Sequence, residues 1–219
     1  MTELVIFDMD GLLIDTEPYW QETEREVFAD FGIHITDEMQ HATFGLRTDE
    51  QIQYWYHRHP WPDPDFKKVE DQYNAAIMDF FRNEANLMEG AEYILDFISQ
   101  TGIPMALASS SSMELIRAFV DRFRFEKYFS LLYSAENEEY GKPHPAVYLS
   151  AAAKLNAHPT RCLAFEDSLN GVIAAKAAKM KVVAVPDARH FDFPGYGIAN
   201  LKLKSLLEFD DQKLQQLSF

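Results

Sequence analysis

Four short runs of apolar residues stand out along the chain. They occupy residues 4–7, 104–108, 162–165 and 182–185, and each is almost free of polar side chains. Runs of this length without alternation are typical of strands that are buried on both faces, as in a parallel sheet. The pattern therefore predicts a sheet assembled from segments that lie far apart in the sequence.

Between these runs, apolar residues recur with the period of a helix. We expect helices over residues 91–100, 113–123, 146–155 and 168–180. The first of them closes at Gly102, a residue type that is common just after a helix. Strands that alternate with helices favour right-handed crossovers and an α/β fold with a parallel sheet.

Residues 17–86 interrupt this alternation, because no strand-like run occurs among them. Helical patterns are expected there over residues 19–31, 48–57 and 66–81, and glycines and prolines separate them. We interpret this segment as an all-helical cap domain inserted after the first strand. Residues 1–16 and 87–219 would then form a Rossmann-like parallel-sheet core.

The composition and the net charge limit the kinds of protein that this chain could be and the partners that it could bind. The 219 residues are 47% apolar, and 20 Lys and Arg stand against 35 Asp and Glu, a formal net charge of −15. A chain of this size can bury a sizeable core without disulfides. The negative charge disfavours nucleic acids and anionic membranes as partners, and no apolar run is long enough to span a bilayer. The single Cys suits a reducing compartment, so we expect a cytoplasmic monomer.

Polar residues follow three of the predicted strands at the point where each strand ends. The candidates are Asp8 and Asp10 after the first strand, Ser109 and Ser110 after the second, Glu166 and Asp167 after the third, and Lys142 just before a predicted helix. Because ligands in open α/β sheets bind outside the carboxyl ends of the strands, these side chains are expected to converge on one site.

Each of these patterns has an ordinary explanation when it is taken alone, such as helix capping by serine or solvated surface charge. Together, however, four carboxylates at one edge repel one another, by about 4 kcal/mol for a pair ~4 Å apart at an effective dielectric near 20. A divalent cation would relieve that repulsion. An all-oxygen site suits Mg²⁺, which keeps waters and accepts a phosphate oxygen, and serines at a helix N-terminus favour an anion.

Four motifs occur in order along the chain: DMDG at 8–11, LASSS at 107–111, GKPHP at 141–145 and FEDSLNG at 165–171. On these motifs the whole chain resembles phosphatases of the haloacid-dehalogenase superfamily, in the β-phosphoglucomutase-like branch with a helical cap. Segments 8–20, 45–47 and 55–61 further resemble bacterial 2-deoxyglucose-6-phosphate phosphatases, also described as hexitol or sugar phosphatases.

The resemblance implies roles for the residues that carry the chemistry. Asp8 matches the nucleophile that forms an aspartyl-phosphate, and Asp10 matches the general acid/base. Ser109, with Ser110 beside it, and Lys142 match the residues that hold the phosphate.

The resemblance also implies a metal site and a cap contact. Asp8, the backbone carbonyl of Asp10 and Asp167 match Mg²⁺ ligands. Glu166 would support these ligands without binding the ion directly, or would contact it through a water. Arg47 is a candidate cap residue for a distal phosphate or for sugar hydroxyls.

These inferences lead us to expect a Mg²⁺-dependent phosphomonoester hydrolase of a small sugar or sugar-alcohol phosphate, with 2-deoxyglucose 6-phosphate as the reference substrate. One alternative is a β-phosphoglucomutase-type phosphotransferase. It is disfavoured because residues 73–81 lack the Lys that the resemblance would lead us to expect. A non-catalytic module that binds sugar phosphates is the other alternative, and the complete acidic set disfavours it.

Overall fold

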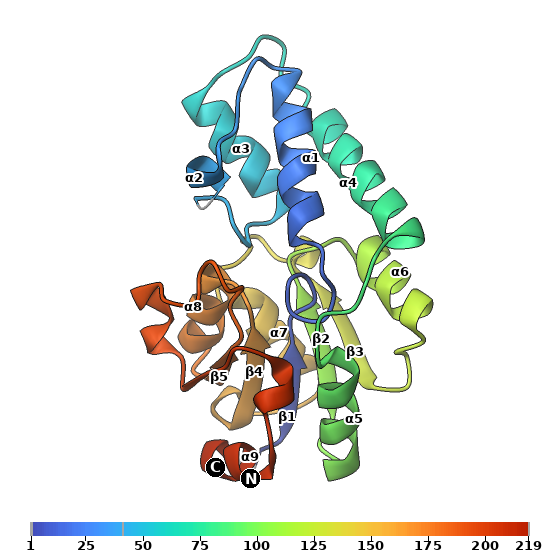
Figure 1. Cartoon of the computed structure of the whole chain (residues 1–219), viewed down its shortest axis with the longest axis vertical. Coiled ribbons are helices and arrows are strands. Elements are labelled where there is room, and N and C mark those ends of the chain that lie inside the picture. Colours follow the sequence, from blue (N-terminus) through green and yellow to red (C-terminus); the bar gives the residue numbers. More distant parts are fainter. Residues whose placement is uncertain (1, 41, 219) are drawn as a thin grey trace.

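The computed structural model describes residues 2–40 and 42–218, and its centre is a six-stranded parallel sheet (Figure 1). The strands lie in the order β3-β2-β1-β4-β5-β6. Their bounds are β1 (Leu4–Phe7), β2 (Met105–Ser109), β3 (Phe129–Ser134), β4 (Cys162–Glu166), β5 (Lys181–Ala184) and β6 (Leu201–Lys202).

The four predicted strands are confirmed within one residue at each end, and they are the four central strands β2, β1, β4 and β5. The two strands that the sequence did not predict, β3 and β6, form the edges. Their residues are partly exposed, so they lack the continuous apolar run of a strand covered on both faces.

Successive residues of a strand point to opposite faces of the sheet, which explains why these runs are apolar throughout. Val5 and Phe7 of β1 pack into one core cluster, and Leu4 and Ile6 pack into another. Helices cover both faces: α5 (Ala91–Thr101), α6 (Met113–Phe123), α7 (Ala146–Lys154), α8 (Leu169–Ala177) and the unpredicted α9 (Asp211–Leu217).

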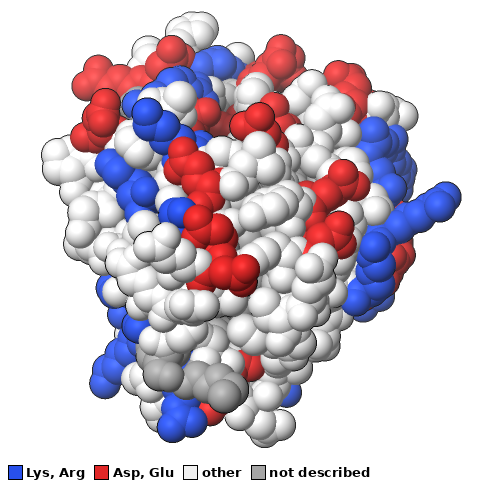
Figure 2. Space-filling model, turned by 60° about the horizontal axis from the view of Figure 1, so that its bottom comes forward, with Lys and Arg blue, Asp and Glu red and all other residues white. Residues whose placement is uncertain are grey.

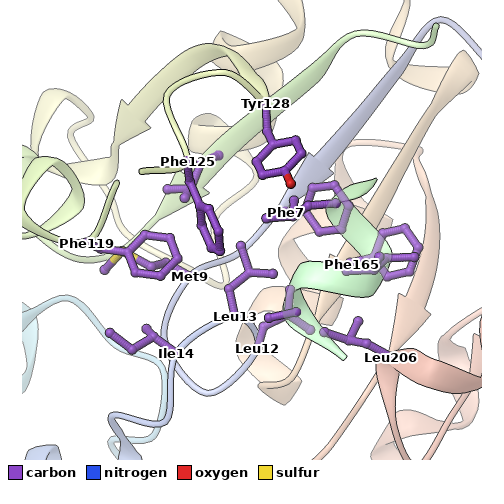
Figure 3. Packing of buried hydrophobic residues seen from close by; sticks show 14 of the residues in the cluster. Phe7, Met9, Leu12, Leu13, Ile14, Phe119, Phe125, Tyr128, Phe165 and Leu206 are labelled. Atoms are coloured by element: carbon purple, nitrogen blue, oxygen red, sulfur yellow. The ribbon is translucent and has the colours of Figure 1, made fainter. Parts of the chain in front are cut away.

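The loop after β1 is anchored by apolar side chains. Met9, Leu12, Leu13 and Ile14 are at most 1% exposed, and Figure 3 shows them packed among rings such as Phe119. The backbone N–H groups of Leu12, Leu13 and Ile14 all donate to the carbonyl of Met9 (2.9–3.3 Å). The first two acidic residues of the predicted site therefore start from a fixed turn.

The segment inserted between β1 and β2 is helical, as predicted, and stands above the sheet (Figure 1). Its helices are α1 (Glu17–Ala29), the unpredicted α2 (Asp37–Gln40), α3 (Thr48–Arg58) and α4 (Phe66–Asn83). They enclose an apolar cluster of their own around Phe28, Trp55 and Tyr73. The predicted fold class, an α/β core with an inserted helical cap, is confirmed.

The two connections between cap and core run side by side. The N–H of Asp15 donates to the carbonyl of Asn86 (3.0 Å), and the N–H of Met88 donates to the carbonyl of Leu13 (3.0 Å). Ile14 also forms an isolated antiparallel bridge with Leu87. The chain thus leaves the core and returns to it at one place.

The described residues also form four short 3-10 helices, η1 (Ala135–Asn137), η2 (Pro159–Arg161), η3 (Pro194–Ile198) and η4 (Leu206–Glu208).

Acidic side chains gather near the middle of the face in Figure 2, and many Lys and Arg lie toward its edges. Within residues 2–40 and 42–218, every helix is too short or too polar to cross a membrane.

Candidate active site

The carboxyl ends of β2, β1 and β4, which are neighbours in the sheet, bring the predicted residues together. They open onto a cavity between the core and the cap. Six of the eight predicted residues line it, namely Asp8, Asp10, Ser109, Ser110, Lys142 and Asp167. The cap side of the lining includes Gln21, Glu24, Gln40, Thr43 and Gln51. The expected convergence at one edge of the sheet is therefore present.

Lys142 lies at the centre of the buried charges, with only 1% of the residue exposed. Its Nζ donates to Asp8 Oδ1 (2.5 Å), to Glu166 Oε1 (2.7 Å) and to the carbonyl of Ala108 (3.2 Å). Burial acts to lower the pKa of Lys142, but Asp8 and Glu166 outweigh that effect and raise it. Lys142 is therefore a fixed positive charge beside Asp8.

Three buried carboxylates lie close together beside this lysine. Asp8, Glu166 and Asp167 each offer an oxygen atom, and these atoms lie within 4.8 Å of one another. Burial raises the pKa of both Asp8 and Asp167, and the neighbouring carboxylates add to that increase. Glu166 is fully buried, and it accepts hydrogen bonds from Lys142 and from the hydroxyl of Tyr148.

The donor set fits a hard divalent cation such as Mg²⁺. One lysine balances only part of the charge of three carboxylates, and oxygen atoms are the ligands that Mg²⁺ prefers. Asp167 is 5% exposed, and its carboxylate accepts no hydrogen bond from the residues that the structure describes. A carboxylate buried in this way is stabilised by a positive partner, and a bound cation would supply one.

Gly11 makes room for Asp167. Its φ is +72°, a conformation that favours glycine, and a Cβ built on it would lie 2.2 Å from Asp167 Oδ2. The glycine of the DMDG motif thus serves the acidic site in addition to the turn.

Asp10 is held by four side chains. Its Oδ1 accepts hydrogen bonds from Thr16 Oγ1 (2.9 Å) and Trp20 Nε1 (3.0 Å). Its Oδ2 accepts from Ser109 Oγ (3.2 Å) and Ser111 Oγ (2.8 Å). Thr16, Trp20 and Ser111 were not among the predicted site residues. Ser111 belongs to the LASSS motif. Thr16 and Trp20 lie in the segment 8–20 that resembles sugar phosphatases but outside the four motifs, and they reach Asp10 because the cap starts here.

Ser110 and the cap loop before α3 meet across the cavity. Ser110 Oγ donates to the carbonyl of Gly45 (3.2 Å), and Asn170 Nδ2 donates to the carbonyl of Phe44 (2.8 Å). Gly45 has a φ of +76°, and a Cβ on it would approach Ser168 Oγ to 2.8 Å. The cap loop therefore packs closely against the core.

Arg47 lies outside the cavity lining. Its guanidinium pairs with Asp49 (2.5 and 2.8 Å) and donates to the carbonyls of Ala135 (2.8 Å) and Glu138 (2.9 Å). The predicted contact with substrate finds no support in this geometry, because core carbonyls and Asp49 occupy the donors. The sequence pattern places Arg47 on the cap, but the core surface that Arg47 meets depends on how the cap docks, which no local pattern encodes.

Comparisons with known proteins agree with this geometry. The sequence matches the family of haloacid dehalogenase-like hydrolases over residues 5–185. Hexitol phosphatase B of Escherichia coli O157:H7 is 39% identical over 210 residues, which cover 95% of each chain.

Solved structures share the fold over nearly the whole chain. CbbY from Rhodobacter sphaeroides, as a mutant in complex with xylulose-1,5-bisphosphate, has a TM-score of 0.85 and 26% identity, with all of both chains covered. β-Phosphoglucomutase from Clostridium difficile has a TM-score of 0.85 and 23% identity, with 99% of this chain and 96% of that one covered. The chain belongs to the haloacid dehalogenase-like hydrolase family.

Proposed function

We propose that the protein is a Mg²⁺-dependent phosphatase that hydrolyses small sugar or sugar-alcohol phosphates through an aspartyl-phosphate at Asp8. The single observation that carries the proposal is the buried group of Asp8, Lys142 and Asp167 at the end of β1, with Asp10 facing the same cavity. The relative named hexitol phosphatase B supports the substrate class.

Lys142 has two tasks in this proposal. It holds one oxygen of Asp8 in place, so that the carboxylate meets the phosphorus in a fixed orientation. Its positive charge also offsets the repulsion between a carboxylate nucleophile and a phosphate dianion. Ser109, at the end of the neighbouring strand β2, would hold a phosphate oxygen.

Asp10 transfers the proton in both half-reactions. As the bond from Asp8 to phosphorus forms and the bond to the sugar oxygen breaks, Asp10 gives its proton to the leaving oxygen. Water then attacks the phosphorus of the aspartyl-phosphate, Asp10 takes the proton of that water, and phosphate and free Asp8 result. The hydrogen bonds from Thr16, Trp20 and the two serines aim Asp10 at the cavity.

The metal would be held by Asp8, Asp167 and the backbone carbonyl of Asp10, with Glu166 in a supporting position. When bound, Mg²⁺ supplies neutralisation of the charge on the phosphoryl group during transfer. We further propose that residues 17–86 act as a cap that closes over the sugar and keeps bulk water away from Asp8.

A phosphate-release assay tests this function. The purified protein should release phosphate from sorbitol 6-phosphate and 2-deoxyglucose 6-phosphate, lose that activity in EDTA, and recover it on addition of Mg²⁺. Asp8→Asn should abolish turnover, whereas Asp30→Asn, at an exposed position of the cap, should leave it unchanged. Absence of phosphate release from every hexose, pentose and hexitol phosphate would reject the proposal.

Phosphotransfer is the alternative to be separated from hydrolysis, because β-phosphoglucomutase shares the fold. The assay adds glucose 1-phosphate with a catalytic amount of bisphosphate. Net isomerisation without release of phosphate would identify a mutase. We expect hydrolysis, since no lysine occurs in residues 73–81.

A further inference from the structure

A buried carboxylate on the cap side of the cavity has no role in the chemistry described above. Glu24, on α1, lines the cavity and is 2% exposed. Its Oε1 accepts hydrogen bonds from Thr43 Oγ1 (3.0 Å), Gln51 Nε2 (2.6 Å) and Trp55 Nε1 (2.7 Å). Glu24 is therefore fixed in one orientation by residues of two other cap segments, the loop that holds Thr43 and the helix α3.

These donors support a charged carboxylate at a place where burial disfavours one. The pKa of Glu24 lies above its ordinary value, because burial raises it by more than the hydrogen bonds from Trp55, Gln40, Thr43 and Gln51 lower it. Three N–H and O–H donors on one oxygen stabilise the ionised form. In its ionised form the Glu24 carboxylate is a hydrogen-bond acceptor and not a donor.

Apart from Glu24, the described residues of the cap-side lining offer no positive charge to balance its carboxylate. The other polar residues of this lining are the uncharged Gln21, Gln40, Thr43, Thr48 and Gln51 and the acidic Glu17. Among the described residues that line the cavity, Lys142 is the cationic one, and it lies on the core side, bonded to Asp8 and Glu166. Arg189 lines an adjoining hollow and pairs with Asp187 (2.8 Å).

We propose that Glu24 is a specificity-determining residue: it accepts substrates whose end remote from the phosphate carries hydroxyl groups, and it excludes those with a second anionic group there. This inference rests on the proposed phosphatase function. A hydroxyl can donate to the Glu24 carboxylate, whereas a carboxylate or phosphate cannot donate and is repelled. Substrates of the bisphosphate or sugar-acid class are therefore selected against by the cap itself.

Two substrates of equal length test the idea. Sorbitol 6-phosphate and 6-phosphogluconate share their phosphate and four secondary hydroxyls, and they differ at C1, where a CH₂OH group replaces a carboxylate. We expect the wild-type kcat/KM to favour sorbitol 6-phosphate by at least about tenfold. In Glu24→Gln, which keeps the shape and removes the charge, that preference should fall by about tenfold.

A control on the same helix distinguishes the effect of a charge inside the cavity from the effect of the protein's net charge. Glu22 is exposed on α1, so Glu22→Gln removes one negative charge away from the cavity and should keep the wild-type preference. Thermal unfolding of both variants checks that they are folded. A merely structural role for Glu24 would lower kcat/KM for both substrates equally and leave their ratio unchanged, which would overturn the inference.

If Glu24→Gln does not fold, hydrolysis of the two substrates by the wild-type protein still tests the role of Glu24. Equal hydrolysis of the two substrates by the wild type would overturn the role of Glu24 and leave the phosphatase function standing. Failure to release phosphate from either substrate, and from p-nitrophenyl phosphate with Mg²⁺, would instead reject the phosphatase function and this inference with it.

Discussion

At the scale of the residue, the site is built from groups whose properties are set by burial. Asp8, Lys142 and Glu166 would be solvated ions on a surface, but here they form a buried group in which one cation serves two carboxylates. Such a group is costly to desolvate, so its presence at a strand end favours a chemical role over a structural one.

Replacing Asp10 tests its assignment as the proton donor and acceptor. Asp10→Ala should lower kcat for sugar phosphates by about 10²- to 10⁴-fold, the usual contribution of a positioned acid/base. Competitive inhibition by inorganic phosphate should persist, because Lys142 and Ser109 remain. Steady-state kinetics with phosphate as inhibitor measure both quantities, and near-normal turnover would show that another group transfers the proton.

Cys162 allows a test of burial that is independent of activity. Burial raises the pKa of its thiol to about 12, so near pH 9 only about a thousandth of it is thiolate. Iodoacetamide should therefore label the folded protein slowly even at pH 9, whereas the protein unfolded in urea should react quickly. Fast labelling of the folded protein, followed by mass spectrometry, would contradict the buried position of β4.

At the scale of the element, the sequence predicted those parts whose environment is uniform along the segment. The central strands are covered on both faces and appear as continuous apolar runs, whereas the long helices are covered on one face and show a helical period. The edge strands β3 and β6 and the short helix α2 have neither pattern. In the site, Asp8, Asp10 and Asp167 follow predicted strands, whereas Trp20 and Glu24 depend on how α1 folds back over the sheet, which no local pattern encodes.

The N-terminus of α3 provides a test at this scale. Arg47 donates to carbonyls of Ala135 and Glu138, and Glu50 accepts from the N–H of Gly141 (2.7 Å), the residue before Lys142. Arg47→Ala should weaken this contact between cap and core and raise KM by several-fold, with little change in thermal stability because the residue is partly exposed.

The matched control is Arg58→Ala, which removes the same charge from the exposed end of α3. Its KM should remain at the wild-type value. If Arg47→Ala also left KM unchanged, the contact between α3 and the core would have no part in substrate binding.

At the scale of the whole molecule, metal binding should be visible as stability. A cation that binds only the folded state adds about 2.7 kcal/mol when its concentration is 100 times its Kd. Mg²⁺ should therefore raise the Tm of the wild-type protein, and EDTA should lower it again. Asp167→Asn should lose most of this shift while Asp30→Asn keeps it, and an equal Mg²⁺ response in both variants would place the cation elsewhere.

The pairing of the two connections at Leu13–Asp15 and Asn86–Met88 has a consequence for how such a protein can diversify. The chain leaves the core and re-enters it at neighbouring positions. The segment between these positions could therefore be replaced as a unit without changing the order of the strands in the sheet. Recombination or engineering could exchange that segment. A new cap would then change the residues that face the substrate, while Asp8 and Lys142 keep their places in the core.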